Sequence, residues 1–443
     1  MREVRAAAMR WITVAILILL LALVLRMELL AYAMYVFLAI LVLSRGMSQA
    51  WARSVTAQRE CNRLTAEVGD TVAVVVTLEN TGRLPIAWLL AEDLLPRRAL
   101  MFRPPNLQLR GNRLQLQMIR PHGRKSLRYQ LVCNRRGYYQ LGPLVAETGD
   151  LFGLHRRFRV VTEPHFLMVY PPVMPLAGFE LASRRPIGEV RMTYRLYEDP
   201  TRIAGVRAYQ PGDPLNRVHW RATARTGALH SKVYEPSSVA GATVLLEFHQ
   251  ASHPARHEPF RSELAVVAAA SIAHAIYTMG QQIGLITNGR DAADRIRVEG
   301  WDFDPRTRTQ ARQAAGMQEH SDRLRPILVP TRRGAEQLRR ILETLARVEL
   351  TDGLRLPELI REVEGHIPRD ATLIVIVPEV TTETVVTLQD LRRRGLAVSA
   401  MLNMYDEHDY AAGAGSLTAV GIETHHLKDE AAVPHICQQV VMR

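Results

Sequence analysis

The first 43 residues contain two apolar runs separated by a short charged break. Uncharged, mostly apolar residues extend from Trp11 to Leu25 and from Leu29 to Leu43, with Arg26-Met27-Glu28 between them. A single helix over both runs would be about 50 Å long with two charges at its centre, whereas the hydrocarbon core of a bilayer is about 30 Å thick. The pattern therefore predicts a transmembrane helical hairpin over residues 1–48.

A cleaved signal peptide is the alternative interpretation of this segment. Its cleavage-like tripeptide, Ala31-Tyr32-Ala33, lies inside the second apolar run, so cleavage there would leave a hydrophobic stump. Arginines flank both ends of the hairpin, at positions 2, 5 and 10 before it and at positions 45, 53 and 59 after it. We therefore expect a two-pass protein of the inner (cytoplasmic) membrane whose soluble domains are cytoplasmic.

Residues 55–169 show short runs in which apolar and polar positions alternate. Examples are 71–78, 114–118 and 127–132, and Gly, Asn and Pro residues separate the runs. A period of two with such punctuation predicts an antiparallel β-sandwich.

From residue 236 to residue 443, continuous apolar runs alternate with helical patterns. The expected strands are 243–246, 283–287, 373–377 and 397–402, and the expected helices are 262–279, 334–348, 357–363 and 383–394. This alternation predicts an α/β domain with a doubly wound parallel sheet. The polar stretch 302–325 is expected to be a loop or mobile insertion.

Composition narrows the range of partners. The chain has 443 residues, a formal net charge of +12, 47% hydrophobic residues and three widely spaced cysteines, Cys61, Cys133 and Cys437. The cysteines suggest neither a disulfide framework nor a metal cluster. The arginines are dispersed and no nucleic-acid module is evident, so we expect no nucleic-acid partner; a basic surface also suits a protein held against an anionic bilayer.

The linking segment, residues 170–235, contains a dense group that we call the arginine–tryptophan motif. Asp213-Pro214 is a good helix start, so a short helix is expected over about Pro214 to Arg221. Three interpretations stay open: a buried tryptophan plug at a domain junction, a partner-docking surface, and a small-anion site. The motif comprises Arg207, Tyr209, Gly212, Asp213, Arg217, Trp220, Arg221, Thr223 and Arg225.

Other short motifs precede it in a fixed order. They are Gly137-Tyr138-Tyr139-x-Leu141-Gly142-Pro143, Asp150-x-Phe152-Gly153-Leu154 and Tyr170-Pro171. With the arginine–tryptophan motif and the two apolar runs, they resemble bacterial domain-of-unknown-function family fifty-eight. The resemblance implies a membrane-anchored protein with a von Willebrand factor A-like C-terminal domain, commonly encoded beside a MoxR-type AAA+ ATPase, which is therefore the expected partner.

Von Willebrand A domains that bind Mg²⁺ carry Asp-x-Ser-x-Ser after the first strand. Here Glu247, His249 and Ala251 stand in those places, Glu379 falls near the late Asp, and Thr351 near the Thr. Mg²⁺ prefers compact oxygen ligands in octahedral geometry, so the site is degenerate and we expect no metal and no cofactor.

Three histidines, His249, His253 and His257, recur every four residues. On a regular helix they could face one zinc ion, but Pro254 interrupts them and favours a loop. We expect them to be surface histidines without a transition metal.

Enzymatic motifs are missing from the sequence. It contains no Gly-x-x-x-x-Gly-Lys phosphate loop, no Gly-x-Ser-x-Gly elbow and no His-Glu-x-x-His. The preferred hypothesis is a non-enzymatic, membrane-tethered adaptor or scaffold that binds proteins at the cytoplasmic face. The alternative is a metal-dependent hydrolase that uses Glu247, His249 and Glu379 at the carboxyl ends of the sheet, where open α/β sheets place their sites.

Overall fold

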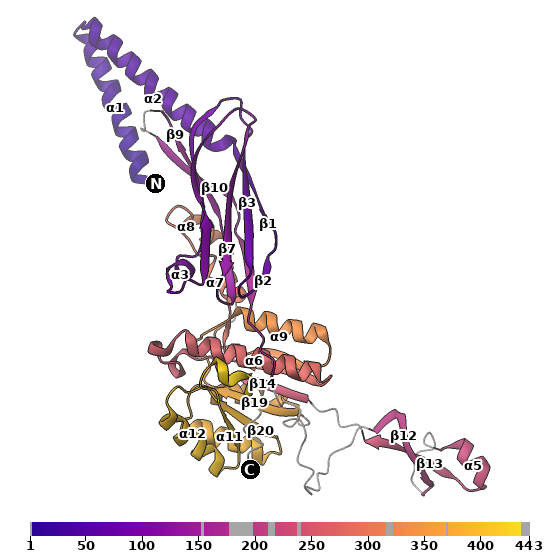
Figure 1. Ribbon diagram of the computed structural model, residues 1–443. Coiled ribbons are helices and arrows are strands. Elements are labelled where there is room, and N and C mark those ends of the chain that lie inside the picture. The colour runs from indigo at the N-terminus through magenta and orange to yellow at the C-terminus, as the bar shows by residue number, and fades with distance from the viewer. Residues whose placement is uncertain are drawn as a thin grey trace. The chain divides into compact units, whose positions relative to one another are not determined.

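The chain folds into two compact units, each made of several stretches of sequence (Figure 1). The computed structural model describes residues 2–151, 155–176, 198–210, 218–236, 241–315, 322–368 and 371–435. Unit 1 comprises residues 1–172, 291–322 and 343–348, and unit 2 comprises residues 173–290, 323–342 and 349–443. The domain expected over 236–443 is thus interrupted, because two of its segments return to unit 1.

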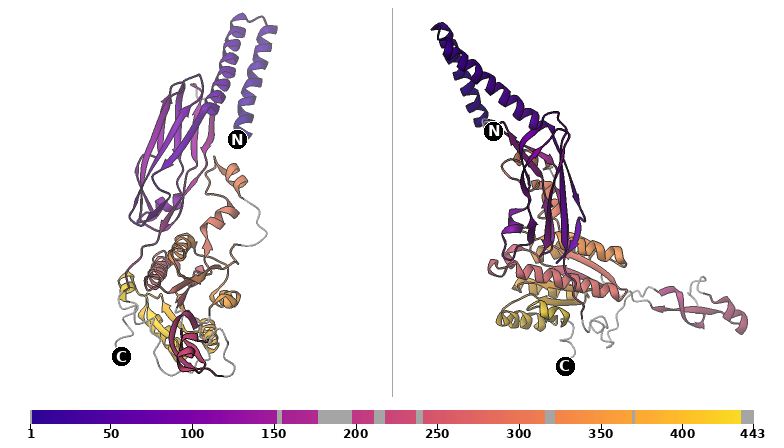
Figure 2. Two further views of the ribbon diagram at one scale, coloured as in Figure 1. Left: turned by 90° about the vertical axis from the view of Figure 1, so that its right-hand side faces the viewer. Right: turned by 45° about the horizontal axis from the view of Figure 1, so that its top comes forward.

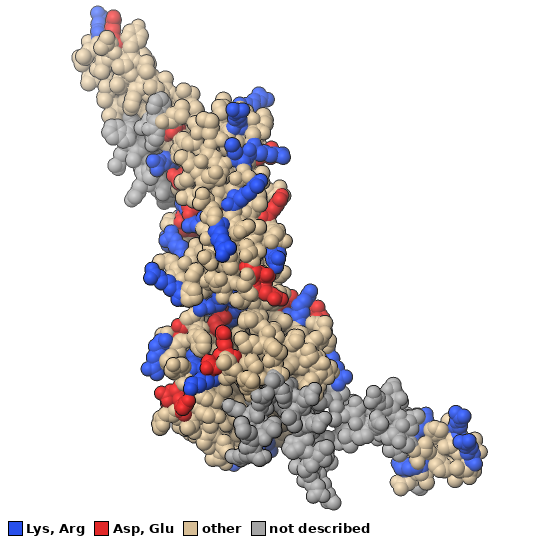
Figure 3. All heavy atoms as spheres, viewed as in Figure 1, with Lys and Arg blue, Asp and Glu red and all other residues tan. Residues whose placement is uncertain are grey.

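Unit 1 begins with two antiparallel helices, α1 (Arg2–Val24) and α2 (Glu28–Ser54), which run side by side (Figures 1 and 2). By length and composition α2 can cross a membrane, with a mean hydropathy of 1.9, whereas Thr13–Val24 is a shorter apolar stretch. Figure 3 shows charged side chains at the tip of this pair. The structure therefore has one long apolar N-terminal helix that could serve as a membrane anchor.

The sandwich of unit 1 consists of two four-stranded antiparallel sheets and a smaller third sheet. The first has the order β1-β3-β7-β5: β1 (Val55–Cys61), β3 (Thr71–Asn80), β7 (Arg124–Cys133) and β5 (Leu107–Gly111). The second has the order β10-β9-β4-β6: β10 (Arg156–Thr162), β9 (Leu144–Gly149), β4 (Ile86–Asp93) and β6 (Leu114–Ile119). The third sheet contains β2 (Thr65–Glu67), β11 (His165–Tyr170) and β8 (Gly137–Leu141). A short helix, α3 (Arg97–Met101), follows β4.

Alternation along β3 explains why this region forms a sandwich. Val72, Val74, Val76 and Leu78 are fully buried, while the residues between them are only partly covered. Successive side chains of a strand point to opposite faces, so the buried series faces the core. The antiparallel β-sheet structure predicted for residues 55–169 is confirmed.

A buried ion pair lies in the core of the sandwich. Arg59 and Asp93 have completely buried side chains; Asp93 accepts hydrogen bonds from Arg59 Nε at 3.1 Å and from the Tyr129 hydroxyl at 2.8 Å. Burial, followed by the charge of Asp93, raises the pKa of Tyr129, so its hydroxyl remains a donor. Gly142 has a φ of 88°, and a Cβ there would collide with the Arg59 guanidinium. This explains why the motif at residues 137–143 has a glycine at position 142.

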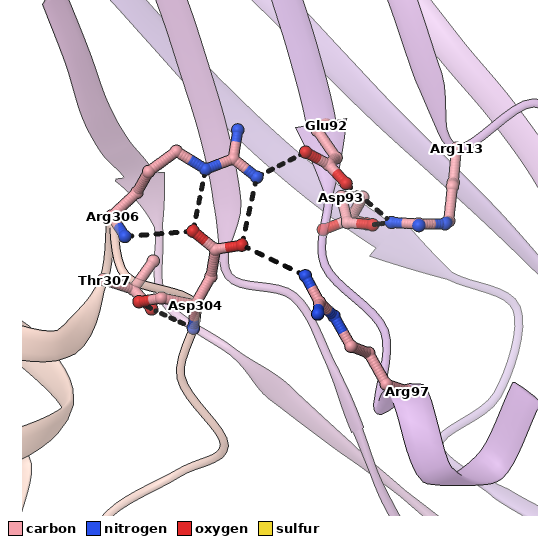
Figure 4. Close-up of polar contacts among 7 residues, drawn as sticks. All are labelled: Glu92, Asp93, Arg97, Arg113, Asp304, Arg306 and Thr307. Atoms are coloured by element: carbon pink, nitrogen blue, oxygen red, sulfur yellow. Dashed lines mark hydrogen bonds and ion pairs between the residues drawn. The ribbon is translucent and has the colours of Figure 1, made fainter. Parts of the chain in front are cut away.

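Residues 291–315 fold against this sandwich rather than forming only a loop. They contain α7 (Ala292–Glu299) and α8 (Arg308–Ala314), and Arg306 bridges Asp304 of its own segment and Glu92 of β4 (Figure 4). The hydrogen bond from Arg306 to Asp304 lowers the pKa of that carboxyl. The Gln140 side chain also pairs with the Asp302 backbone: Gln140 Oε1 accepts from the Asp302 amide at 2.8 Å, and Gln140 Nε2 donates to the Asp302 carbonyl at 3.1 Å.

The prediction of a loop over 302–325 is therefore wrong for its described first part. The segment is held by charged and amide groups, and a search for apolar periodicity does not detect such contacts. A second returning segment, 343–348, is held by buried Arg136, which donates to the carbonyls of Leu345 and Val348 at 2.9 and 2.8 Å.

Unit 2 is built on a six-stranded sheet of order β17-β15-β14-β19-β20-β21. Five strands are parallel and the edge strand β17 is antiparallel. In Figure 1, α6 and α9 lie on one face of the sheet, and α11 and α12 on the other. The strands are β17 (Ile327–Arg332), β15 (Gln282–Thr287), β14 (Gly241–Leu246), β19 (Ala371–Val377), β20 (Val398–Leu402) and β21 (Glu423–His426).

Four of the helices of this region, α6, α9, α10 and α11, agree with the expected ones, whereas α12 was not predicted. These helices are α6 (Phe260–Thr278), α9 (Ala335–Arg347), α10 (Leu356–Val363), α11 (Thr382–Arg393) and α12 (Glu407–Ala419). The apolar sides of α10, α11 and α12 share a core with β14, β19 and β20. Two short strands, β16 (Arg290–Asp291) and β18 (Val348–Glu349), form a separate pair. The C-terminal region is a mixed α/β structure.

The linking segment contains a two-stranded arm. Antiparallel strands β12 (Glu198–Ala208) and β13 (His230–Pro236) flank the helix α5 (Trp220–Thr226). Most of the helix expected over Pro214–Arg221 lies outside the described residues. The described helix α5 starts at Trp220, where the His219 ring accepts a hydrogen bond from the Ala222 amide at 3.0 Å and so caps the first turn. Gly227, with a φ of 73°, ends it. Gly212, Asp213 and Arg217 lie outside the described residues.

Candidate functional site

The described part of the arginine–tryptophan motif places its large side chains in solvent. Trp220, at the start of α5, is 68% exposed, and Leu229, in the turn before β13, is 46% exposed. The prediction of a buried tryptophan plug is therefore wrong. The arm is too thin to bury an indole, since two strands and a seven-residue helix provide no second layer to cover it.

The remaining motif residues divide between structural and exposed roles. Thr223 is structural: its hydroxyl accepts from the His230 amide at 3.1 Å and its carbonyl from the Gly227 amide at 2.9 Å. Tyr209 donates its amide to the Leu229 carbonyl at 2.9 Å, and Arg207 donates to the Ala208 carbonyl at 3.2 Å.

Arg221 and Arg225 are exposed and four residues apart, so they share one stripe of α5 beside Trp220. Neither forms an ion pair with any residue that the structure describes. Figure 3 shows Lys and Arg side chains at this end of the arm. The helix α5 thus carries an exposed indole and, on a neighbouring stripe, two guanidinium groups that form no ion pair with a described residue.

The carboxyl end of the sheet in unit 2 is the second candidate site. Glu247 directly follows β14, is 5% exposed, and accepts a hydrogen bond from Ser252 Oγ at 2.9 Å. Burial is the main reason that its pKa rises from 4.5 to about 7; Glu379 raises it further, whereas Ser252 and Arg355 lower it. Glu247 and Glu379 thus interact electrostatically, as the sequence predicts for two residues that follow neighbouring parallel strands.

The residues at the degenerate adhesion positions are engaged in the loop itself. His249 Nδ1 accepts from the Ala251 amide at 3.1 Å, and the Thr351 hydroxyl accepts from the Gly353 amide at 3.1 Å. Within the described ranges, no group of three or more His, Cys, Asp or Glu side chains is arranged to hold a metal ion. These side chains therefore stabilise the turn after β14.

The histidine series does not share a face. His253 is packed edge-on against Phe248 at 5.6 Å, whereas His257 stacks on Tyr405 at 5.7 Å. The prediction of surface histidines is wrong for two of the three, because His249 and His253 are 7% and 4% exposed. Two short 3₁₀ turns fold residues 250–257 back on the sheet edge, and burial lowers the pKa of His253.

Asn288 is a site residue that sequence reasoning missed. Its side-chain oxygen accepts from the Phe248 amide at 2.7 Å, and its side-chain nitrogen donates to the Leu354 carbonyl at 2.7 Å. The position of Asn288 just after the apolar run 283–287 was the available signal, since polar residues after parallel strands gather at one sheet edge. Asn288 fixes the loop that follows Glu247.

Taken by its parts, the chain is a protein with an apolar N-terminal helix, a β-sandwich unit and a mixed α/β unit. Residues 205–300 match the family described as "Protein of unknown function DUF58". The uncharacterized protein YeaD of Bacillus subtilis (strain 168) is 24% identical over 263 residues, which cover 59% of this chain and 62% of that protein. The match thus spans less than two thirds of the relative. Both findings support the DUF58 family, in agreement with the resemblance of the motifs.

Similar solved structures resemble only parts of the chain. Proximal thread matrix protein 1 from the mussel byssus is 9% identical, with a TM-score of 0.30 and coverage of 46% of this chain and 47% of that one. The CARDB domain of the PF1109 protein from Pyrococcus furiosus is 11% identical, with a TM-score of 0.19 and coverage of 26% and 86%. Likeness at this level carries no indication of function.

Proposed function

We propose that this protein is a non-enzymatic, membrane-tethered adaptor that binds a partner protein through the end of its arm. The observation that carries the proposal is Trp220, whose side chain is 68% exposed on the same short helix as Arg221 and Arg225, which have no ion-pair partner in the described part of the chain. Tryptophan and arginine are the residue types most enriched at the energetic centres of protein interfaces. Residues 205–300, which match the family, include this helix.

The proposed location of the protein at the membrane rests on its N-terminal helices. We propose that α1 and α2 together form a two-pass hairpin and that both units lie on the cytoplasmic side, where the flanking arginines favour retention. Reporter fusions after residue 60 test the sidedness, and activity of a periplasmic reporter would overturn it.

The partner is proposed from the family resemblance. The α/β region is proposed to be von Willebrand A-like, with an adhesion site made degenerate by Glu247, His249 and Ala251. The partner is proposed to be a MoxR-type AAA+ ATPase. The parallel strand order of unit 2 supports the first point, and the engaged side chains after β14 support the absence of a metal requirement.

The binding test uses the full chain in detergent and a purified MoxR-type ATPase. Trp220→Ala and the double variant Arg221→Glu/Arg225→Glu should each weaken binding at least about tenfold, or about 1.4 kcal/mol. Met101→Ala, at a residue 78% exposed on α3, is the control for loss of an apolar side chain. Arg332→Glu/Arg333→Glu is the charge-matched control at exposed positions of unit 2. Unchanged affinity in both arm variants would refute the arm as the binding surface.

The metal-dependent hydrolase is tested separately. Glu247→Gln should leave partner affinity within about threefold, and titration of the protein with Mg²⁺ or Mn²⁺ should show no saturable site at millimolar concentration. A tight, stoichiometric metal site that Glu247→Gln abolishes would instead support the hydrolase.

A further inference from the structure

The second half of α2 is packed on the sandwich. Its buried positions, Leu41, Ser44, Ser48 and Trp51, are spaced three or four residues apart and form one stripe, and Trp51 belongs to the sandwich core. Ser44 Oγ lies 3.0 Å from His155 Nδ1, in the turn before β10, and Arg157 Nε donates to Ser48 Oγ at 3.3 Å. α2 ends at Ser54 and β1 begins at Val55, so no linker separates the helix from the sandwich.

The length of the apolar run fixes the depth of these contacts in a membrane. The 15 residues from Leu29 to Leu43 extend about 22 Å as a helix, which is less than the roughly 30 Å of hydrocarbon that a spanning helix must cross. The hydrocarbon boundary therefore lies at or beyond Ser44, and a polar headgroup layer about 5–8 Å thick follows. Side chains that contact Ser44 and Ser48 lie at the depth of this layer.

The side chains at that depth are basic and apolar. We call them the β10 collar: Arg45, Arg53, Arg156, Arg157 and Arg159, with Leu151 and Phe158. Leu151 is 65% exposed and Phe158 is 38% exposed. Among the described residues, none forms an ion pair with Arg45, Arg53, Arg156 or Arg159.

The acid in the turn before β10 is buried. Asp150 is 2% exposed and accepts a hydrogen bond from the His155 amide at 2.6 Å, so it is not part of the exposed surface of the collar. Burial lowers the pKa of His155, and the nearby Arg45 and Arg157 lower it further while Asp150 raises it. Cations from α2 and from β10 thus converge on one histidine.

From this arrangement we infer that the β10 collar binds the anionic headgroups of the bilayer that holds α2. Guanidinium groups attract anionic lipids, and exposed leucine and phenylalanine side chains enter the acyl boundary, which is the pairing that interfacial segments use. The inference rests on the proposed membrane insertion of α2 but not on the partner or on the arm. Contact at the collar, together with the missing linker, holds the sandwich directly against the membrane surface.

The first experiment measures the depth of the collar. The full chain carrying Cys437→Ala and Phe158→Cys is labelled with a nitrobenzoxadiazole fluorophore and reconstituted in nanodiscs of phosphatidylcholine and phosphatidylglycerol, with the chain lacking the new cysteine as the labelling blank. A nitroxide on the lipid headgroup should quench position 158 at least about threefold more than the same label at Leu64→Cys. Leu64 is 45% exposed and follows β1, whose seven residues carry the chain about 20 Å away from α2.

The second experiment tests the charge. Arg156→Glu/Arg159→Glu should reduce quenching at position 158 at least about twofold in anionic nanodiscs, and pure phosphatidylcholine should reduce it similarly. Arg98→Glu/Arg103→Glu, at exposed residues in and after α3, makes the same charge change and should have no effect. Co-elution of the protein with nanodiscs reports insertion of α2 independently. Equal quenching at positions 158 and 64, or failure to co-elute, would overturn the inference, and neither result bears on binding by the arm.

Discussion

A buried carboxyl group in each unit, Asp93 in unit 1 and Glu247 in unit 2, has different surroundings. In unit 1, Asp93 is fully buried and receives hydrogen bonds from the Arg59 guanidinium and the Tyr129 hydroxyl. In unit 2, Glu247 is 5% exposed and accepts a hydrogen bond from the Ser252 hydroxyl, while Glu379 adds a repulsive charge. Asp93 has a cation in contact with it, whereas no cation among the described residues forms an ion pair with Glu247.

This difference separates a structural charge from a titratable one. A buried carboxylate remains ionised where a cation and further donors compensate for its lost hydration. Without them burial favours the neutral acid, and the pKa of Glu247 accordingly rises to about 7. Burial of an acid is therefore not by itself a sign of function, and the partners of the acid decide what it can do.

Removing the cation from the first site should produce the largest effect. Arg59→Met leaves Asp93 buried without its ion-pair partner, and breaking such a pair costs about 3–5 kcal/mol in the free energy of unfolding. Urea unfolding of the full chain in detergent, followed by the fluorescence of Trp51 and Trp88, measures the loss in unit 1.

Arg128→Met is the matched control, because Arg128 is exposed on β7, so its removal should change stability by no more than about 0.5 kcal/mol. Equal effects of the two variants would mean that Asp93 does not depend on Arg59.

The second site should respond to pH. The folded protein holds a proton on Glu247 up to about pH 7, whereas an unfolded chain releases it near 4.5, so the folded state loses stability as the pH rises through this window. The difference corresponds to about 3 kcal/mol at pH 8. Glu247→Gln cannot titrate; it should therefore match the wild type near pH 4.5 and exceed its stability by up to about 3 kcal/mol at pH 8.

Hydrogen exchange of the peptides that contain β14 and β19, measured at pH 5 and pH 8, checks this pH dependence. Glu383→Gln, at an exposed residue of α11, is the control. A stability difference between Glu247→Gln and the wild type that is the same at both pH values would contradict the raised pKa.

The sequence predicted those features that depend on periodicity. The alternation over 71–78 became the buried face of β3, and the helix expected over Glu383–Arg394 became α11, Thr382–Arg393. Both signals are local, because one strand face or one helix stripe is read from consecutive residues. The boundaries of the four helices expected in the C-terminal region differed by at most two residues, which is within the ordinary fraying of helix ends.

Features that depend on tertiary contacts between polar residues were not predictable in this way. Arg59 and Asp93 are 34 residues apart, and Arg306 and Glu92 are 214 apart; neither pair leaves a repeating pattern in the sequence. The burial of His249 and His253 depends on two 3₁₀ turns after β14 that only the folded chain reveals. The exposure of Trp220 depends on the absence of a covering layer in the arm, which composition does not show.

The smallest effect on stability is expected at Trp220, because a substitution there removes neither a buried charge nor a buried ring. Because the side chain is 68% exposed, Trp220→Ala should change the free energy of unfolding of unit 2 by no more than about 0.5 kcal/mol. Phe248→Ala is the contrasting variant in the same unit: that ring is 1% exposed, and its removal should cost about 3–5 kcal/mol. Urea titration monitored by hydrogen exchange of unit 2 peptides compares the two.

A loss of several kcal/mol in Trp220→Ala would show that the indole is covered in the folded protein and would support the interpretation of a buried tryptophan plug. An unchanged stability has a further use, because a loss of partner binding in this variant could then be assigned to the missing indole contact and not to unfolding of the unit that carries it.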